Sequence, residues 1–263
     1  RVRGVLTLSP LINDAGINFQ VVKYVDFSGA LYAVCSNFKV YKIVDGVPTL
    51  KYDYTAEESA EATVTDAIVF GGYLFIAIGG ENKYWFTDDP DTVGNYTEAT
   101  PDESVADYFG KVGDVMWKGV LPNKVKFAAD PPNTTNPWST EYYVGDSSSN
   151  ITDISGFNGE VYFGKEDGLY KIDFDGDLIE LLAPFKFLPS ANNFTPLVAW
   201  GDKLVFPVLN ALYVYDGETL QNISPSIYMP TVVDYTGTMR AIVADTDWLY
   251  VIVDPAGDNN NAV

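Results

Sequence analysis

Few residues in this sequence could do acid–base, redox or metal chemistry, because the chain has no histidine and a single cysteine. Histidine-dependent triads, histidine general bases and histidine-ligated zinc are therefore excluded. Cys35 has no partner for a disulfide within the chain. Its position between Val34 and Ser36 favours a small buried core residue, and a reactive thiol is the alternative.

Acidic segments are the remaining candidates for metal binding. Residues 173–177, followed by Glu180, have the composition of a calcium loop. An EF-hand loop requires glycine at its sixth position and glutamate at its twelfth, whereas Gly176 is fourth here and Pro184 is twelfth. A hairpin turn at Asp175-Gly176 explains this segment better, and a solvated turn explains Asp88–Asp91. We therefore predict no metal ligands and no cofactor.

Carboxylate pairs could also cleave glycosidic bonds. Because the chain has 36 acidic residues, a close pair somewhere is expected and says little. A sialidase-type site holds its substrate carboxylate with an arginine cluster, but the only arginines are Arg1, Arg3 and Arg240. We expect no catalytic residues and no enzymatic activity, with a glycosidase as the minor alternative.

The net charge of −20 restricts the partners. A surface that follows nucleic-acid phosphates must be basic, so this chain would be repelled by DNA or RNA. No apolar run reaches the roughly 18 residues needed to cross a bilayer. We expect neither a nucleic acid nor a membrane as partner.

Any site must be positioned by the secondary structure, which the sequence predicts as a repeat. Each copy of the repeat has an apolar strand, a tight turn with Gly or Asp, and a second apolar strand. Six copies occur, at residues 25–34, 68–76, 108–117, 154–163, 198–206 and 241–250. The residues that open the second strands lie 43, 41, 46, 43 and 45 positions apart, at Leu31, Leu74, Val115, Val161, Leu204 and Leu249. So narrow a spread is typical of repeated structural units rather than of unrelated loops.

A third strand with alternating aromatic residues follows in five copies, at residues 39–43, 83–86, 124–127, 169–172 and 212–215. Dipeptides such as Asn158-Gly159 and Asp216-Gly217 supply the positive φ angles that tight hairpins require. Three to four short strands in about 44 residues match one blade of a β-propeller. The sequence therefore predicts an all-β fold, a β-propeller of four-stranded antiparallel blades, with about five to six blades visible.

Blades that stack face to face bury both faces, which explains why the middle strands are almost continuously apolar. The same packing would bury many of the aromatic residues, which make up 14% of the chain, although exposed ones could stack on sugars. Residues 55–62 could form two helical turns or an acidic loop between blades.

Both ends of the sequence suggest a single propeller domain, 1–263, that is truncated at both ends. Arg1 is not preceded by a leader pattern, and Ala262-Val263 read as the start of a returning strand. A frayed terminus is the alternative. If the ends are cut, the missing segments would complete the ring.

One stretch is more specific than the repeat. Val144-Gly145-Asp146, a polar run to Asn150 and the strand 151–154 lead to the segment 161–172, which contains Gly164-Lys165. Upstream lie Asp130-Pro131 and Trp138-Ser139, and downstream Asn222–Pro225 resembles a segment that ends a propeller blade. The stretch from Asp130 to Asp173 resembles a recurrent segment of β-propeller virion proteins of tailed bacteriophages, including tail-nozzle and tail-hub types. It departs from the nozzle type at Glu166-Asp167-Gly168, where those relatives often carry basic residues.

This resemblance implies a non-enzymatic structural propeller of a virus particle, in the tail or another virion component, that acts as a rigid platform for protein interaction. Its partners would be other virion subunits, in a homo-oligomeric or ring-like arrangement, and its location the extracellular particle. Contact residues are expected in loops, namely Asn133, Trp138, Tyr142, Tyr143 and Asn150. The alternative is a surface propeller that binds glycans.

Overall fold

The predicted hairpins are present in the computed structural model of the chain. The structure describes residues 21–45, 47–58, 62–80, 83–99, 105–132, 137–173, 178–184, 197–208, 211–223, 238–244 and 249–254. Two compact units are defined by their internal contacts, Ser9–Tyr142 and a second unit that contains Tyr143–Val263. They are called the N-terminal and C-terminal units below.

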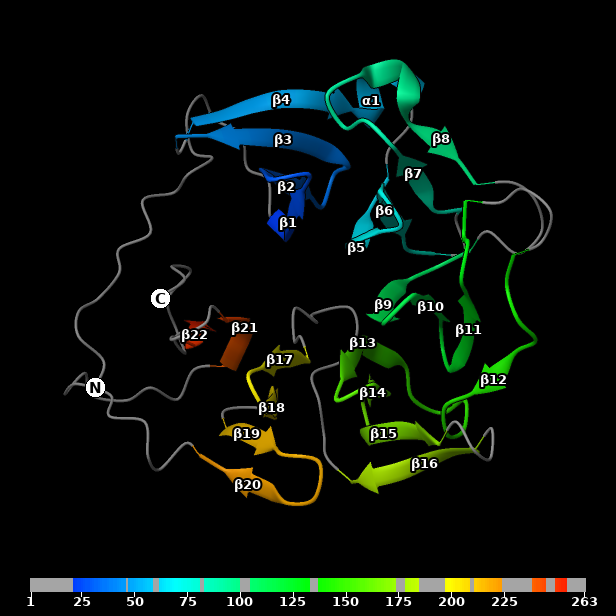
Figure 1. Cartoon of the computed structure of the whole chain (residues 1–263), viewed down its shortest axis with the longest axis vertical. Coiled ribbons are helices and arrows are strands. Elements are labelled where there is room, and N and C mark those ends of the chain that lie inside the picture. Colours follow the sequence, from blue (N-terminus) through cyan, green and yellow to red (C-terminus); the bar gives the residue numbers. More distant parts are fainter. Residues whose placement is uncertain are drawn as a thin grey trace. The chain divides into compact units, whose positions relative to one another are not determined.

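The N-terminal unit contains three four-stranded antiparallel sheets (Figure 1). The first sheet has the strands β1 (Val21–Phe27), β2 (Ala30–Cys35), β3 (Lys39–Val44) and β4 (Val47–Asp53). The second has β5 (Val64–Phe70), β6 (Tyr73–Ile78), β7 (Trp85–Thr87) and β8 (Thr97–Glu98). The third has β9 (Tyr108–Val112), β10 (Val115–Val120), β11 (Lys124–Ala128) and β12 (Tyr142–Tyr143), whose first residue is the last one of this unit.

The C-terminal unit continues the pattern with two four-stranded sheets and one strand pair. The fourth sheet has β13 (Ile151–Phe157), β14 (Glu160–Lys165), β15 (Gly168–Asp173) and β16 (Leu178–Ala183). The fifth has β17 (Val198–Trp200), β18 (Lys203–Val208), β19 (Ala211–Tyr215) and β20 (Leu220–Asn222). The pair consists of β21 (Thr238–Ala244) and β22 (Leu249–Asp254), and its predicted turn lies outside the described residues.

Helical structure is confined, in the described ranges, to two short pieces, α1 (Tyr54–Glu58) and the 3₁₀ turn Val93–Asn95. Of the two interpretations of residues 55–62, the helical one is confirmed for residues 55–58, and residues 59–61 lie outside the described residues. The predicted turn at Asn158-Gly159 has φ angles of 51° and 79°, and it joins β13 to β14 in register. This is the left-handed conformation that an Asn-Gly hairpin adopts.

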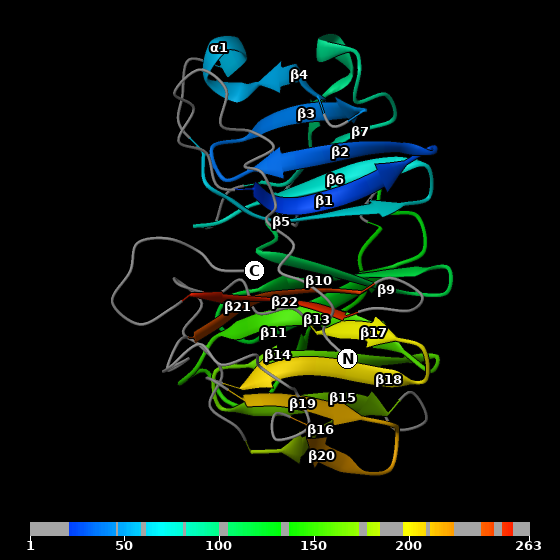
Figure 2. The ribbon, with the colours of Figure 1, turned by 90° about the vertical axis from the view of Figure 1, so that its left-hand side faces the viewer.

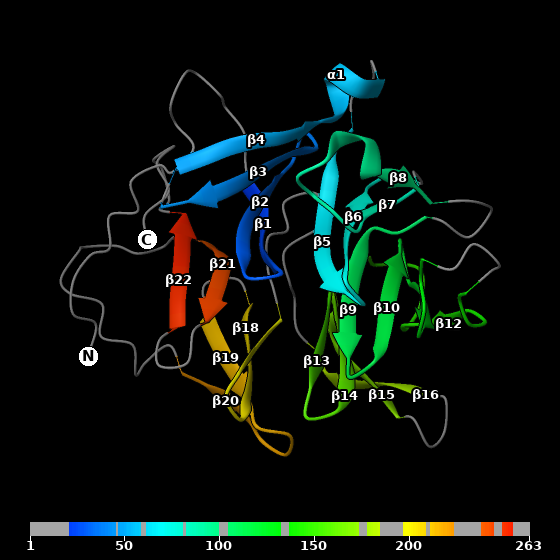
Figure 3. The same ribbon diagram turned by 45° about the horizontal axis from the view of Figure 1, so that its top comes forward.

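Within each unit, neighbouring sheets pack face to face. One core joins the first sheet to the second and includes Tyr32, Leu74 and Trp85 (Figure 2). Another joins the second sheet to the third, where β9 runs beside β5 (Figure 3). The second sheet is thus covered on both faces, which is why β6 is buried from its second residue to its last.

Candidate interaction site at residues 144–170

The loop that precedes β13 folds over the β14–β15 hairpin, and its conformation begins at Gly145. This glycine has φ +58°, and a Cβ atom added to it would lie 2.8 Å from the hydroxyl oxygen of Tyr170. Only glycine combines that backbone conformation with so close an approach. Tyr170 is buried and donates a hydrogen bond of 3.1 Å to Asp167 Oδ2, and burial raises the pKa of its phenol to about 12.

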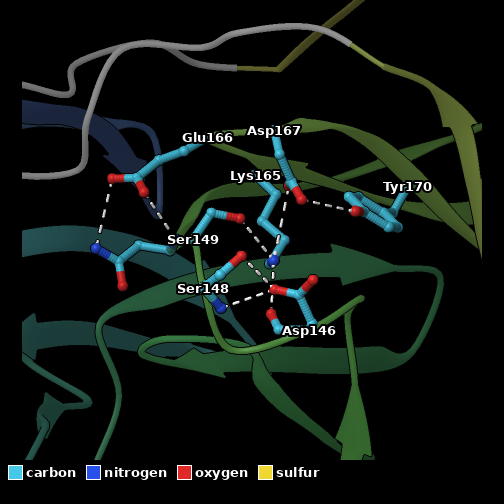
Figure 4. Close-up of polar contacts among 8 residues, drawn as sticks. Asp146, Ser148, Ser149, Lys165, Glu166, Asp167 and Tyr170 are labelled. Atoms are coloured by element: carbon cyan, nitrogen blue, oxygen red, sulfur yellow. Dashed lines mark hydrogen bonds and ion pairs between the residues drawn. The ribbon is translucent and has the colours of Figure 1, made fainter.

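Lys165, the last residue of β14, fixes the middle of the loop. Its side chain is fully buried, and its Nζ donates to the carbonyl oxygen of Asp146 at 2.7 Å and to Ser149 Oγ at 2.8 Å (Figure 4). Asp167 Oδ1 lies 3.6 Å from the same nitrogen. The three protons of the ammonium group thus face three oxygens, which offsets the cost of burying a charge.

Glu166 fixes the end of the loop. Its Oε2 accepts the backbone N–H of Asn150 at 3.0 Å, and its own backbone N–H donates to the Asn150 carbonyl at 3.0 Å. The Asn150 amide nitrogen adds a contact of 3.4 Å to Oε1. Loop and hairpin are therefore joined by reciprocal bonds, and the part of the resembling stretch from residue 144 to residue 170 contains this cluster.

The exposed parts of the cluster are the turn 145–148 and Asp167. Asp146 accepts hydrogen bonds from the hydroxyl and the backbone N–H of Ser148, and these bonds lower the pKa of its carboxyl group. The turn therefore presents a carboxylate, hydroxyl groups and backbone groups in fixed positions. Such a surface is suited to binding a partner, because preorganised groups lose little conformational entropy on association.

The predicted contact residues are only partly brought together. Asn150 is half-buried within the cluster, and Tyr143 is 55% exposed where the chain enters the loop. Tyr142 is half-buried, with its ring 5.9 Å from that of Phe127 in the N-terminal unit. Asn133 lies outside the described residues.

Trp138 differs from its prediction. Its place in a proline-rich loop predicts an exposed side chain, but only 7% of the residue is exposed. The indole nitrogen donates to the Tyr84 hydroxyl at 3.2 Å, and Lys118 Nζ lies 4.6 Å from the centre of the indole ring. Trp138 belongs to the core between the second and third sheets, because burying its large ring there outweighs the loop's preference for solvent.

Two buried carboxylates that the sequence did not single out link successive sheets. Asp66 Oδ2 accepts the backbone N–H of Phe109 at 2.8 Å, and Asp153 Oδ2 accepts that of Leu197 at 2.6 Å. Each follows a register shift near the start of the first strand of its sheet. We call these contacts carboxylate latches. The signal was present as Thr-Asp eight residues before Leu74 and Val161, the positions that define the repeat.

Asp91 has a similar role in the acidic turn 88–91. Its carboxylate receives Lys42 Nζ at 2.5 Å, Lys51 Nζ at 3.4 Å and the hydroxyl of Tyr32 at 3.1 Å. Asp91 is exposed, as expected of a solvated turn, and its carboxylate also joins the second sheet to the first. Hydrogen bonding from Lys42, chiefly, lowers the pKa of its carboxyl group.

Other candidates are limited by what the structure describes. Among the described residues, no three His, Cys, Asp or Glu side chains gather closely enough to hold a metal ion. The turn 174–177 of the calcium-like segment lies outside them. Cys35 is a free, buried thiol, and burial raises its pKa to about 11. No helix in the described ranges has the length and apolar character needed to span a bilayer.

Comparison with known proteins supports the fold. No family model and no curated protein sequence matches the chain. Solved β-propellers do match it. The extracellular domain of the one-component system BT4673 from B. thetaiotaomicron matches with a TM-score of 0.63 and 14% identity over 91% of this chain and 32% of that one. YCF48 bound to the D1 peptide matches with a TM-score of 0.61 and 12% identity over 90% of this chain and 75% of that one.

PorZ, a surface component of the type-IX secretion system of Porphyromonas gingivalis, matches with a TM-score of 0.59 and 12% identity over 88% of this chain and 29% of that one. The chain thus spans about a third of the length of the first structures that it matches. These likenesses, together with five four-stranded antiparallel sheets, define the chain as an all-β protein of the β-propeller class. The predicted fold class is confirmed.

Proposed function

We propose that this chain is a non-enzymatic structural propeller of a phage particle, which acts as a rigid platform for neighbouring virion subunits. The observation that carries the proposal is the pinned loop 144–150. It lies in the stretch that resembles phage propellers, and Lys165 and Glu166 hold it in one conformation.

The chemistry of the cluster favours binding over catalysis. Lys165 is buried against three oxygens, and both oxygens of Glu166 contact Asn150, so these groups hold the loop in place. The exposed residues here are those of the turn 145–148, Asp167 and Tyr143. One propeller with the same fold, YCF48, is described in complex with a peptide, which supports an interaction role for this fold.

The particle assignment is tested on purified virions from the source of the sequence. Mass spectrometry should find peptides of this chain in stoichiometric amounts, and immunogold labelling should mark one defined position on the particle. Particles that lack the chain, or a chain found only in the lysate, would contradict the proposal.

The platform role is tested with Lys165→Met, which removes the ammonium group and leaves a side chain of similar length. Loss of its bonds should increase amide hydrogen exchange in residues 145–150 and weaken incorporation into particles. Lys203→Met is the matched control, because the one ion pair of Lys203 among the described residues is with the exposed Asp202 in the same unit. Equal incorporation of both variants would count against the loop as the contact.

A glycan-binding propeller is the second candidate, because Tyr143 is 55% exposed and comes two residues before the exposed turn 145–148 in the chain. Aromatic rings at such positions can stack on sugars. A glycan array that shows specific binding, lost in Tyr143→Ala and kept in Tyr24→Ala, would favour this function over the platform.

A further inference from the structure

Two long outer strands have an edge with which no other described strand pairs. β4 is the last strand of the first sheet and β16 the last of the fourth (Figure 1). Within the part of the chain that the structure describes, no strand pairs with the outer edge of either. An open edge offers unpaired backbone groups to another strand, and proteins usually protect it with charges, prolines or shortness.

Both edges carry exposed aliphatic side chains, although β4 also contains Pro48 and the charged residues Lys51 and Asp53. On β4, Leu50 is 45% exposed and Val47 is 62% exposed. On β16, Leu181 is 50% exposed and Leu182 is 36% exposed. The two strands have similar lengths, with seven and six residues. By comparison, the outer strand β20 has three residues and one exposed leucine, Leu220, so it is too short to accept a strand of this length.

The charges of the two hairpins are complementary. The β3–β4 hairpin, 39–53, has three lysines and two aspartates, whereas the β15–β16 hairpin, 168–183, has one lysine and four acidic residues. Lys42 and Lys51 of the first hairpin share the carboxylate of Asp91, so this hairpin together with Asp91 is electrically neutral, whereas the β15–β16 hairpin has a net negative charge. In a chain of charge −20, this lysine-rich edge is suited to an acidic strand.

We infer that the β4 edge of one copy of this chain pairs with the β16 edge of a second copy. Pairing of β16 with itself would bring two acidic hairpins together, which costs electrostatic free energy. The contact joins different surfaces, so a dimer still offers one free β4 edge and one free β16 edge, and the association can continue from copy to copy. The inference goes beyond the proposed function and does not depend on the phage assignment.

A pair of six- or seven-residue strands forms a small interface. Contacts below about 1,200 Å² are typical of weak or transient association. We therefore expect self-association only at high protein concentration, or when other contacts already hold the copies near one another.

Cross-linking of mixed variants tests the pairing directly. Leu50→Cys and Leu181→Cys are made separately, and Cys35 stays unreactive because it is fully buried. With a short bis-maleimide, the mixture should give cross-linked dimers, whereas each variant alone should give few. Because each variant carries one new thiol, every product joins two copies. Dimers of Leu50→Cys alone would overturn the inference in favour of β4–β4 pairing, and equal yields with a Leu220→Cys mixture would show random collision.

Sedimentation velocity supplies an independent measurement. The unmodified chain should associate at concentrations of about 10⁻⁴ M and above, beyond dimers. Leu50→Asp or Leu181→Asp alone should abolish association, and a mixture of the two should form dimers only, since one productive pair of edges remains. Leu220→Asp should leave association unchanged. An unmodified chain that stays monomeric up to about 10⁻³ M overturns the inference.

Discussion

The carboxylate of Asp153 lies 2.6 Å from the backbone nitrogen of Leu197, 44 residues later in the chain. Asp66 and Phe109 have the same relationship across 43 residues. Because both aspartates are buried, each latch joins the first strand of one sheet to the start of the next within its unit.

Removal of a latch should destabilise the fold. Asp153→Ala leaves the Leu197 N–H buried without its acceptor, so we expect the free energy of unfolding to fall by about 1–3 kcal/mol. Urea denaturation followed by tryptophan fluorescence measures it. Asp202→Ala is the control, because its side chain is 87% exposed and should change stability little. Equal effects of the two substitutions would contradict the role of the latch.

Gly145→Ala should destabilise the C-terminal unit for two separable reasons, the positive φ and the approach of Tyr170. Gly201→Ala isolates the first, because Gly201 has φ +59° and no atom within 4 Å of the added Cβ. We expect the free energy of unfolding to fall by about 1 kcal/mol in Gly201→Ala and by more in Gly145→Ala. Tyr170→Phe removes the nearest atom, so Gly145→Ala should cost less in that background. A double-mutant cycle measures the difference, and strict additivity would count against the contact.

Asp91 should contribute a pH-dependent part of the stability. Its folded pKa is lower than its ordinary value, so the ionised carboxylate stabilises the fold above that value, and the contribution is lost as pH falls through the folded pKa. Asp91→Asn should therefore be less stable than the unmodified chain at pH 7, and this gap in stability between the two proteins should narrow below about pH 4. Urea midpoints between about pH 7 and pH 2.5 measure it. A gap that is constant with pH would refute the ion pair as its cause.

Cys35 should react slowly in the native chain. Its thiol is buried, and with a pKa of about 11 only about one thiol in a thousand is ionised at pH 8. We expect labelling by a disulfide reagent to be at least about 100-fold slower than in denaturant. The exposed thiol of Leu50→Cys is the positive control. Native labelling at the rate of that control would show that the first sheet opens readily.

The sheets were predictable because their signals are local. Turn residues such as Asn158-Gly159 set the backbone conformation directly, and alternating aromatic residues mark the strands that follow. The spacing of the repeat strengthens the prediction of these sheets, and five four-stranded sheets do recur at the predicted interval.

The candidate site was only half predictable, because its contacts join residues that are distant in the sequence. Lys165 has the sequence pattern of a surface lysine at a strand end, and nothing local shows that a loop folds over it. Trp138 is misleading for the same reason, since its loop predicts exposure while Tyr84, 54 residues earlier, provides the buried partner. Long-range packing overrides local preference at both positions.

In both latches the donor is a backbone N–H group rather than a side chain. The donor residue is phenylalanine in one latch and leucine in the other, so the contact requires no particular residue type and excludes only proline, which has no N–H. A latch of this kind therefore tolerates substitutions in the sheet that donates the N–H group. A sheet could be duplicated or exchanged between chains and still form this hydrogen bond with the sheet that precedes it.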